Sequence, residues 1–362
     1  MRSLFDQTKL SGLNLKNRFV RSATRDGFAD DRGHMTKELL KIYEDLAKGG
    51  VGTIITGHAY VTDIEKSKQP RQMGIYDDSF IEDYEELTQT VHRYDANIIL
   101  QISCVGSQTI ASAGERLIWG PSPVEDLASK ITPKEMTKKE IRFLQNAFAD
   151  AALRAKKAGF DGVQLHVAHG YVLTKFLTPY YNRRTDEYGG GIEKRAAIVF
   201  ETYEAIRGKV GREYPVIVKI NSEDYMDQGM TFDECKYVCR KLAQLGINAI
   251  EVSGGSFSSR PNEGAVRKIT TDQGPYFKSH AMELADEVDV PILLVGGNRD
   301  YDAINAILNS TNIEYFSLCR PLLCESDLIN RWKSGDTKRA KCVSCNKCLG
   351  LESSTCIFNR PK

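Results

Sequence analysis

The sequence lacks a long hydrophobic run and a large excess of either charge. Of its 362 residues, 49 are Lys or Arg and 48 are Asp or Glu, so the formal net charge is +1. The longest basic clusters are dipeptides such as Lys138-Lys139, whereas nucleic-acid binding needs a basic surface that neutralises phosphates. No window approaches the roughly 18 apolar residues of a membrane span, and residues 1–18 contain no signal-peptide core. We therefore expect a cytoplasmic protein without nucleic-acid or membrane partners.

Cysteine is sparse except at the C-terminus. Five of the nine cysteines are scattered, and the last 21 residues contain the other four, which are Cys342, Cys345, Cys348 and Cys356. Scattered cysteines in a cytoplasmic chain are usually reduced, whereas closely spaced ones indicate a metal or redox site. The sequence therefore predicts a separate role for this C-terminal segment.

Short runs rich in Val, Ile and Leu alternate with amphipathic stretches along the chain. Eight such runs occur, at 18–23, 52–61, 97–103, 162–167, 215–221, 249–255, 291–297 and 315–321. Several are continuously apolar, which is typical of parallel strands buried on both faces. Eight strand–helix alternations favour a single (β/α)₈ TIM barrel over an open sheet. We place this barrel at residues 1–335 and a Cys-rich tail at 336–362.

The spacing of apolar residues predicts helices between these strands. Helical patterns cover 36–50, 137–158 and 231–246, and another helix opens near Glu193. Thr231 is the expected N-cap of the third pattern, and Gly246 is its expected end. The longest interruption, 106–134, follows the third strand and is either a lid over the barrel mouth or a passive surface loop.

Functional groups of a parallel barrel lie at the C-terminal ends of its strands. Strands seven and eight end in Leu-Val-Gly-Gly-Asn (294–298) and Leu-Cys-Arg-Pro (318–321). Gly296 and Gly297 would let backbone N–H groups approach a phosphate, and Arg320 would add a bidentate contact. A tight turn with no ligand is the alternative explanation for the two glycines.

Strands three, four and five carry further polar residues. Lys219 lies in an apolar run, where an ammonium group is costly unless it meets an anion or a polar ligand. Gln101 can both donate to and accept from one edge of a heterocycle. His166, His169 and Tyr171 emerge at the end of strand four, where imidazoles can donate to an oxyanion and a phenol can deliver a proton.

The stretch HVAHGYVLTKFLTPYYNRRTDEYGGGIEKR (166–195) resembles the strand-four signature of the Old Yellow Enzyme family of FMN-dependent NADH:flavin oxidoreductases and ene-reductases. Within this family it is most similar to the branch that contains the N-terminal FMN barrel of bacterial 2,4-dienoyl-CoA reductase. Agreement extends to LKNRFVRSAT (15–24), GGVGTIITGHAYV (49–61), VGGNR (295–299) and SLCRPLL (317–323).

The resemblance implies a role for each matching position. His166 and His169 would bind a substrate carbonyl, and Tyr171 would be the proton donor. The residues implied to contact the flavin ring are Ser22, Ala23, Thr24, Gly57, Gln101 and Lys219, and those implied to hold its phosphate are Gly297, Asn298, Cys319 and Arg320.

The implied reaction is reduction of an α,β-unsaturated carbonyl compound or an enoyl thioester. NAD(P)H would reduce FMN, hydride would pass to the β-carbon of the alkene, and Tyr171 would protonate the α-carbon. Four positions depart from the family pattern: Arg25 stands where relatives carry a small or aromatic residue, Cys104 stands where histidine is common, and Gly191 and Lys194 replace the usual Ser and Asn. Arg25 and Cys104 leave the redox potential open, and Arg25 also leaves the substrate class open.

The C-terminal segment resembles the iron–sulfur segment of the dienoyl-CoA reductase branch, with a C-x₂-C-x₂-C-x₇-C spacing that is shorter than in that branch. A four-iron four-sulfur cluster held by Cys342, Cys345, Cys348 and Cys356, a zinc or structural site, and free thiols are three open alternatives. In those relatives a following FAD- and NAD(P)H-binding portion supplies the cluster with electrons.

Two other functions are compatible with such a barrel. One is an FMN-dependent amine dehydrogenase or demethylase, which requires an aromatic or acidic pocket for a cation. The other is a flavin-free, phosphate-binding aldolase or isomerase, in which Lys219 would form a Schiff base. We also expect a homo-oligomer.

Overall fold

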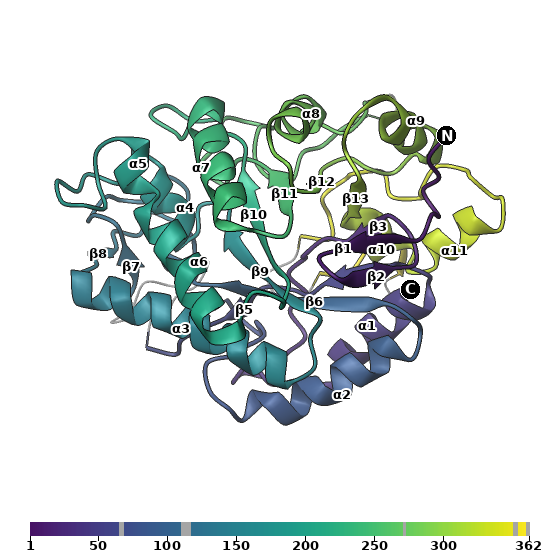
Figure 1. Ribbon diagram of the computed structural model, residues 1–362, viewed down its shortest axis with the longest axis horizontal. Helices are drawn as coiled ribbons and strands as arrows, with labels where there is room; N and C mark the ends of the chain where they lie inside the picture. The colour runs from purple at the N-terminus through teal and green to yellow at the C-terminus, as the bar shows by residue number, and fades with distance from the viewer. Residues whose placement is uncertain (65–68, 110–116, 271–272, 350–353, 360–362) are drawn as a thin grey trace.

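A closed barrel of parallel strands forms the centre of the molecule (Figure 1). The computed structural model describes residues 1–64, 69–109, 117–270, 273–349 and 354–359. The sheet order runs β4-β3-β13-β12-β11-β10-β9-β6, and pairing of β4 with β6 closes it. The eight barrel strands are β3 (Phe19–Arg21), β4 (Thr53–Ile55), β6 (Asn97–Ser103), β9 (Gly162–Val167), β10 (Val216–Asn221), β11 (Ile250–Ser253), β12 (Ile292–Leu294) and β13 (Tyr315–Leu318). The predicted TIM barrel is confirmed.

Helices wrap around the outside of the barrel (Figure 1). The longer helices follow successive barrel strands, as the βα alternation requires. They are α1 (Lys37–Lys48), α2 (Phe80–His92), α3 (Lys138–Lys157), α6 (Ala197–Val210), α7 (Phe232–Leu245), α8 (Lys278–Glu287) and α9 (Tyr301–Ser310). Shorter helices occupy the loops, at α4 (Val172–Leu177), α5 (Ile192–Arg195), α10 (Arg320–Cys324) and α11 (Leu328–Lys333), with 3₁₀ turns at Gly106–Gln108 and Ile357–Asn359.

The predicted helix ends agree with the observed caps. The Thr231 side chain accepts from the backbone N–H of Glu234, and Gly246 adopts the left-handed conformation that ends α7. A second capping box, of Thr137 with Glu140, opens α3. These caps stabilise helix termini that the hydrophobic pattern alone leaves undefined.

Some elements differ from the predicted ones. The run 52–61 forms two strands, β4 and the short β5 (Ala59–Tyr60), because the chain turns away after Ile55. Strand β10 ends at Asn221, as the 215–221 run predicts, so Lys219 lies inside the barrel wall two residues before the strand end. An antiparallel hairpin of β1 (Thr8–Leu10) and β2 (Leu13–Leu15) was not predicted.

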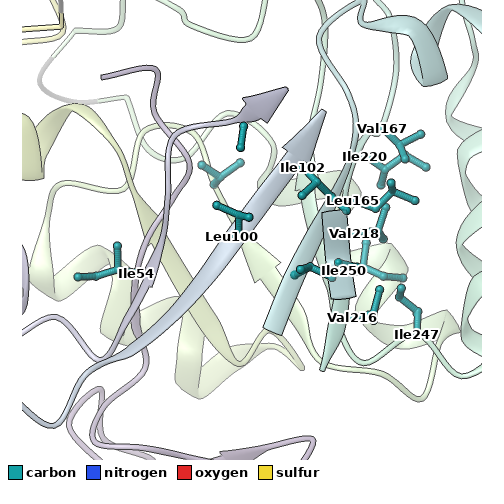
Figure 2. Packing of buried hydrophobic residues seen from close by; sticks show 14 of the residues in the cluster. Ile54, Leu100, Ile102, Leu165, Val167, Val216, Val218, Ile220, Ile247 and Ile250 are labelled. Atoms are coloured by element: carbon teal, nitrogen blue, oxygen red, sulfur yellow. The ribbon is translucent and has the colours of Figure 1, made fainter. Parts of the chain in front are cut away.

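Strand side chains alternate between the outside and the inside of the barrel. Outward residues such as Leu165, Val167, Val218 and Ile220 pack in one large core beneath the helices (Figure 2). A separate cluster contains inward residues from the barrel strands, namely Val20, Ile55, Ile99, Ile217, Ala249, Leu293 and Tyr315. Leu10 and Leu15 of the β1–β2 hairpin join the same cluster. This cluster forms an apolar floor, so polar inward residues collect in the layers nearer the C-terminal ends.

The loop that follows β6 is attached to the barrel by a buried ion pair. It contains β7 (Trp119–Gly120), which pairs with β8 (Lys134–Glu135), and residues 110–116 of it lie outside the described residues. Lys175 of α4 lies 2.5 Å from Asp126 of this loop, and both side chains are buried. The Lys175 ammonium also lies 4.4 Å from the centre of the Tyr181 ring.

The segment after residue 335 packs against the barrel. The Ala340 N–H donates to the Arg299 carbonyl, and the Arg299 guanidinium donates to the Ser344 hydroxyl at 3.0 Å. The division at 335/336 therefore stays a prediction. Among the helices in the described ranges, none combines the length and the apolar character needed to cross a membrane.

Candidate functional site

Three histidines and a tyrosine form one cluster at the barrel mouth. His166 belongs to β9, His169 and Tyr171 follow it, and His58 lies between β4 and β5. The His166 ring centre is 4.8 Å from that of Tyr171 and 5.1 Å from that of His169, and the His58 and Tyr171 centres are 5.2 Å apart. Sequence reasoning identified all of these except His58, whose signal was its position within the 52–61 run, directly after Gly57.

Polar neighbours at other strand ends hold His169 in place. Its backbone has a positive φ of 63°, and its N–H donates to the Asn221 side chain at 3.1 Å. Its Nε2 lies 2.8 Å from the Ser253 hydroxyl. A left-handed backbone is costly for a residue with a side chain, so these contacts from β10 and β11 maintain the position of the imidazole.

The cluster is uncharged at neutral pH. Burial lowers the pKa of His58 to about 3 and lowers the pKa of His166 and of His169 well below the ordinary value. Burial raises the pKa of Tyr171, which the nearby Arg25 guanidinium partly opposes. Neutral imidazoles and a protonated phenol therefore meet at one place, where they can donate hydrogen bonds and a proton.

One atom of the cluster has a vacant hydrogen-bonding capacity. Nδ1 of His166 is buried and has no hydrogen-bond partner among the residues that the structure describes. Buried polar side-chain atoms are rarely unpaired in folded proteins. An oxygen of a bound ligand would satisfy this nitrogen, in agreement with the predicted role of His166.

A connected polar layer lies inside the barrel between the apolar floor and the histidines. Gln101 donates to Gln164 at 2.7 Å, Gln164 donates to Glu251 at 2.8 Å, and Ser22 donates to Glu251 at 2.6 Å. Lys219 donates to Ser22 at 2.8 Å and lies 3.4 Å from Glu251. The anion expected near Lys219 is therefore the carboxylate of Glu251. Sequence reasoning missed Glu251, although an acidic residue within the apolar 249–255 run is the same kind of signal as Lys219.

The chain between β3 and α1 borders this layer. Thr24 donates to the Ser22 carbonyl, and Ala23 packs against the apolar floor. A Cβ on Gly57 would lie 2.9 Å from the Thr24 carbonyl, so only glycine permits this approach. The structure therefore brings Ser22, Ala23, Thr24 and Gly57 to one side of the mouth, and their contact with a flavin ring stays a prediction.

Gly296 and Gly297, at the end of strand seven, form a tight and closely packed turn. Gly296 and Gly297 have φ of 91° and 93°, and a Cβ on Gly297 would lie 3.1 Å from both the Gly274 carbonyl oxygen and the Pro275 Cα. Asn298 donates to the Leu294 and Ser317 carbonyls, while its buried Oδ1 has no partner within the described ranges. Glycine is thus required here by backbone conformation and packing alone.

Arg320 is already engaged by neighbouring segments. It donates to the Arg267 carbonyl at 3.0 Å and to the Asn346 side chain of the C-terminal segment. Cys319, which precedes it, is half-buried. The phosphate-binding role of Gly297, Asn298, Cys319 and Arg320 stays a prediction.

The C-terminal cysteines lie near one another without forming a metal site in the described residues. Cys348 and Cys356 are buried, and Cys342 and Cys345 are half-buried. Burial raises the pKa of the Cys324 thiol, on α10, to about 12, and the neighbouring Cys356 thiol adds to this effect. Across the part of the chain that the structure describes, no three His, Cys, Asp or Glu side chains are placed to hold a metal ion. The iron–sulfur cluster therefore stays a prediction.

Arg25 lies beside the histidine cluster. Its guanidinium donates to the Pro70 carbonyl at 3.0 Å. A common cavity is lined by Arg25, Gly57, His58 and Gln72. His58 in turn contacts Tyr171, and burial raises the pKa of Tyr171, an effect that the Arg25 charge partly opposes. The departure from the family pattern at position 25 therefore places a cation next to the predicted proton donor.

The sequence and the fold are similar to those of known flavin oxidoreductases and reductases. The chain is 31% identical over 351 residues to an NADH oxidase of Thermoanaerobacter brockii, covering 96% of this chain and 54% of that protein. It is also 31% identical over 321 residues to an NADPH dehydrogenase of Clostridium acetobutylicum, covering 88% and 91%. A solved structure of 2-naphthoyl-CoA reductase in complex with 2-naphthoyl-CoA shares the fold with a TM-score of 0.89 at 24% identity, covering 98% and 56%.

The chain spans about half the length of the NADH oxidase of Thermoanaerobacter brockii and of other curated relatives that it matches. A family model describing the NADH:flavin oxidoreductase / NADH oxidase family matches residues 3–339, which is nearly the whole chain. Because this family consists of oxidoreductases, the match leaves no support for the alternative of a flavin-free aldolase or isomerase. The chain therefore belongs to the NADH:flavin oxidoreductase / NADH oxidase family, the flavin-dependent oxidoreductases of the Old Yellow Enzyme type.

Proposed function

We propose that this chain is an FMN-dependent ene-reductase that uses NAD(P)H to reduce the C=C bond of an α,β-unsaturated carbonyl compound. The supporting observation is the uncharged cluster of His166, His169 and Tyr171, in which His166 Nδ1 is buried without a partner in the described part of the chain. Neutral donors suit a substrate oxygen that gains negative charge during the reaction.

The residues at the mouth fit the FMN that the family implies. Lys219 lies beside Glu251 in the buried polar layer. The Oδ1 of Asn298, at the end of strand seven, has no hydrogen-bond partner among the residues that the structure describes. We expect Ser22, Ala23, Thr24, Gly57, Gln101 and Lys219 to contact the ring and Gly297, Asn298, Cys319 and Arg320 to hold the phosphate. When bound, FMN would supply the hydride that it takes from NAD(P)H.

The side chains of this chain bind and protonate the substrate. His166 and His169 donate to the carbonyl oxygen, which withdraws electrons from the alkene and makes the β-carbon electrophilic. Tyr171 gives its phenolic proton to the α-carbon. Addition of one hydride and one proton across the C=C bond balances the oxidation of NAD(P)H to NAD(P)⁺.

We infer that the substrate is an enone or an enoyl thioester. The 2-naphthoyl-CoA reductase that shares the fold was solved with a CoA thioester, and the positive charge of Arg25 lies next to the cluster. A cationic amine would be repelled by Arg25 and would find imidazoles that stay neutral. These charges favour the ene-reductase over the amine dehydrogenase.

Anaerobic titration tests the proposal. We expect the purified protein to show a flavin spectrum that NADH or NADPH bleaches and that an enone or enoyl thioester restores. Dimethylamine-type substrates serve as the comparison and should leave the oxidised spectrum unchanged. A colourless protein that does not take up added FMN, or bleaching by amines, would contradict the proposal.

The same sample tests the C-terminal cysteines. A cluster would add broad visible absorbance to the anaerobically purified protein, together with iron and acid-labile sulfide. A flavin-only spectrum without iron or sulfide would rule the cluster out, and zinc analysis would then separate a structural metal from free thiols. Either result leaves the proposed reaction at the barrel mouth unaffected.

A further inference from the structure

Gln72 holds the His58 ring in a defined hydrogen-bonding arrangement. The Gln69 backbone N–H donates to Gln72 Oε1 at 2.7 Å, so the amide nitrogen of Gln72 faces His58. That nitrogen donates to the His58 carbonyl at 3.1 Å and lies 2.8 Å from His58 Nδ1. All three residues are buried.

This arrangement determines which ring nitrogen of His58 carries the proton. Nδ1 also lies 3.2 Å from the Ser103 hydroxyl, which can donate or accept. The amide NH₂ group of Gln72 is nearer and can only donate, so Nδ1 accepts and is unprotonated. Burial lowers the pKa of His58 to about 3, so the ring is neutral at pH 7. Its single ring proton therefore lies on Nε2, which is 3.3 Å from the hydroxyl oxygen of Tyr171.

The direction of the His58–Tyr171 bond follows. Nε2–H donates, and the Tyr171 oxygen accepts. A phenol oxygen that accepts this bond still has its own proton to donate elsewhere, whereas the other tautomer of His58 would take that proton as an acceptor. The bond also stabilises negative charge on the oxygen, as does the charge of Arg25.

We propose that His58 is a positioning residue that aims the Tyr171 proton at the substrate and stabilises the phenolate left behind. This inference rests on the proposed role of Tyr171 as proton donor. The Tyr171 O–H bond breaks as a C–H bond forms at the α-carbon, the hydride equivalent comes from NAD(P)H, and water later reprotonates the phenolate. Gln72 acts one step further out, by fixing the tautomer of His58.

The tautomer distinguishes this role from simple packing. The His58 and Tyr171 rings meet edge-on at 62°, a contact that either tautomer would make equally well. ¹⁵N NMR of the FMN-loaded protein labelled at histidine reports the protonation of each ring nitrogen, and the His58→Leu variant assigns its signals. We expect an unprotonated Nδ1 and a protonated Nε2; a protonated Nδ1 would overturn the proposal.

Kinetics of a mutant cycle supply the second test. His58→Leu should slow reoxidation of the reduced protein by an enone about ten- to a hundredfold, the usual effect of losing a hydrogen bond to a charged group. In a Tyr171→Phe background the same change should have no further effect. Equal losses in both backgrounds would show that His58 does not act through Tyr171.

Two further variants complete the design. His34→Leu makes the same side-chain change at a histidine stacked on Phe80 outside the cluster, and it should leave reoxidation unchanged. Should His58→Leu not fold, Gln72→Leu removes the donor to Nδ1 and should both mix the tautomers and slow reoxidation. A fully retained Nε2–H tautomer in that variant would refute the role of Gln72. A harmless Tyr171→Phe would instead contradict the proposed function, which the tautomer measurement does not test.

Discussion

Replacing His166 and His169 together by alanine should separate the two halves of the reaction. Both imidazoles are buried and neutral, and His166 Nδ1 has no partner in the described ranges, so it can donate to a substrate without breaking a bond within the protein. Loss of one donor to a developing oxyanion slows a reaction by about 10²–10³-fold. Because both histidines act on one oxygen, we expect the double variant to lose about that factor and not its square.

Anaerobic stopped-flow measurements of flavin absorbance provide the assay. Reduction by NAD(P)H should stay nearly unchanged, since hydride delivery to the flavin requires no activation of an alkene. Reoxidation by an enone should slow by the factor given above. Equal loss of both half-reactions would refute the reasoning, because it would mean that the histidines support the flavin site and not the substrate carbonyl.

Protein stability must be measured beside these rates. His166 is 3% exposed, so its truncation leaves a cavity that destabilises the barrel. The FMN content and the thermal midpoint of each single variant show whether the fold survives. His169→Ala loses the contact with Ser253, and the positive φ at this position stays unfavourable because alanine also carries a Cβ.

Four other changes test separate parts of the site. Tyr171→Phe should slow reoxidation by protonation-dependent acceptors about 10²–10⁴-fold, whereas Tyr181→Phe, which removes a hydroxyl bonded to Ser258, should not; an unchanged rate in the first would exclude Tyr171 as the acid. Glu251→Gln removes the carboxylate 3.4 Å from Lys219, so the flavin midpoint potential should rise, and a potential equal to wild type would contradict the electrostatic coupling. Acidification should destabilise the fold: His58 has a folded pKa of about 3 against 6.5 in the unfolded chain, so the unfolded state alone gains its proton, and stability falls by up to about 1.4 kcal/mol per pH unit as the pH drops below 6.5. Thermal midpoints that stay constant from pH 7 to 5 would show that the buried histidines titrate normally. Lys175→Met leaves the buried Asp126 carboxylate without its cation and should cost about 3–5 kcal/mol. Lys175→Met/Asp126→Asn removes the charge but keeps an acceptor for the Ala128 and Ser129 N–H groups, so it should restore most of the loss; an equally unstable double variant, judged by denaturant midpoint, would argue against an electrostatic cause.

The fold could be predicted from the sequence because its signals are local. Short runs rich in Val, Ile and Leu, such as 162–167 and 215–221, indicate strands covered on both faces. Thr231 and Gly246 mark helix ends within a few residues of the backbone that they cap. Each signal depends on neighbours along the chain. The β1–β2 hairpin was not predicted because its strands are short and their apolar residues pack against side chains that only the closed barrel brings together.

The candidate site shows where such reasoning ends. His166, His169 and Tyr171 lie within six residues of one another, so the sequence by itself placed them at one strand end. His58 joins them across 113 residues, and Glu251 meets Ser22 across 229. No local pattern reports such pairings, because they arise only when strands distant in sequence become neighbours in the barrel.

The sequence alone determined the chain's fold, its family resemblance and the residue types available for chemistry. The tertiary structure decided which of those groups interact: that Lys219 pairs with Glu251, that Arg320 bonds to the C-terminal segment, and that Gln72 sets the proton on His58. The physical reason is that charge, protonation and hydrogen-bond direction depend on burial and on partners within a few ångströms. Those partners are supplied by barrel closure and not by proximity in the sequence.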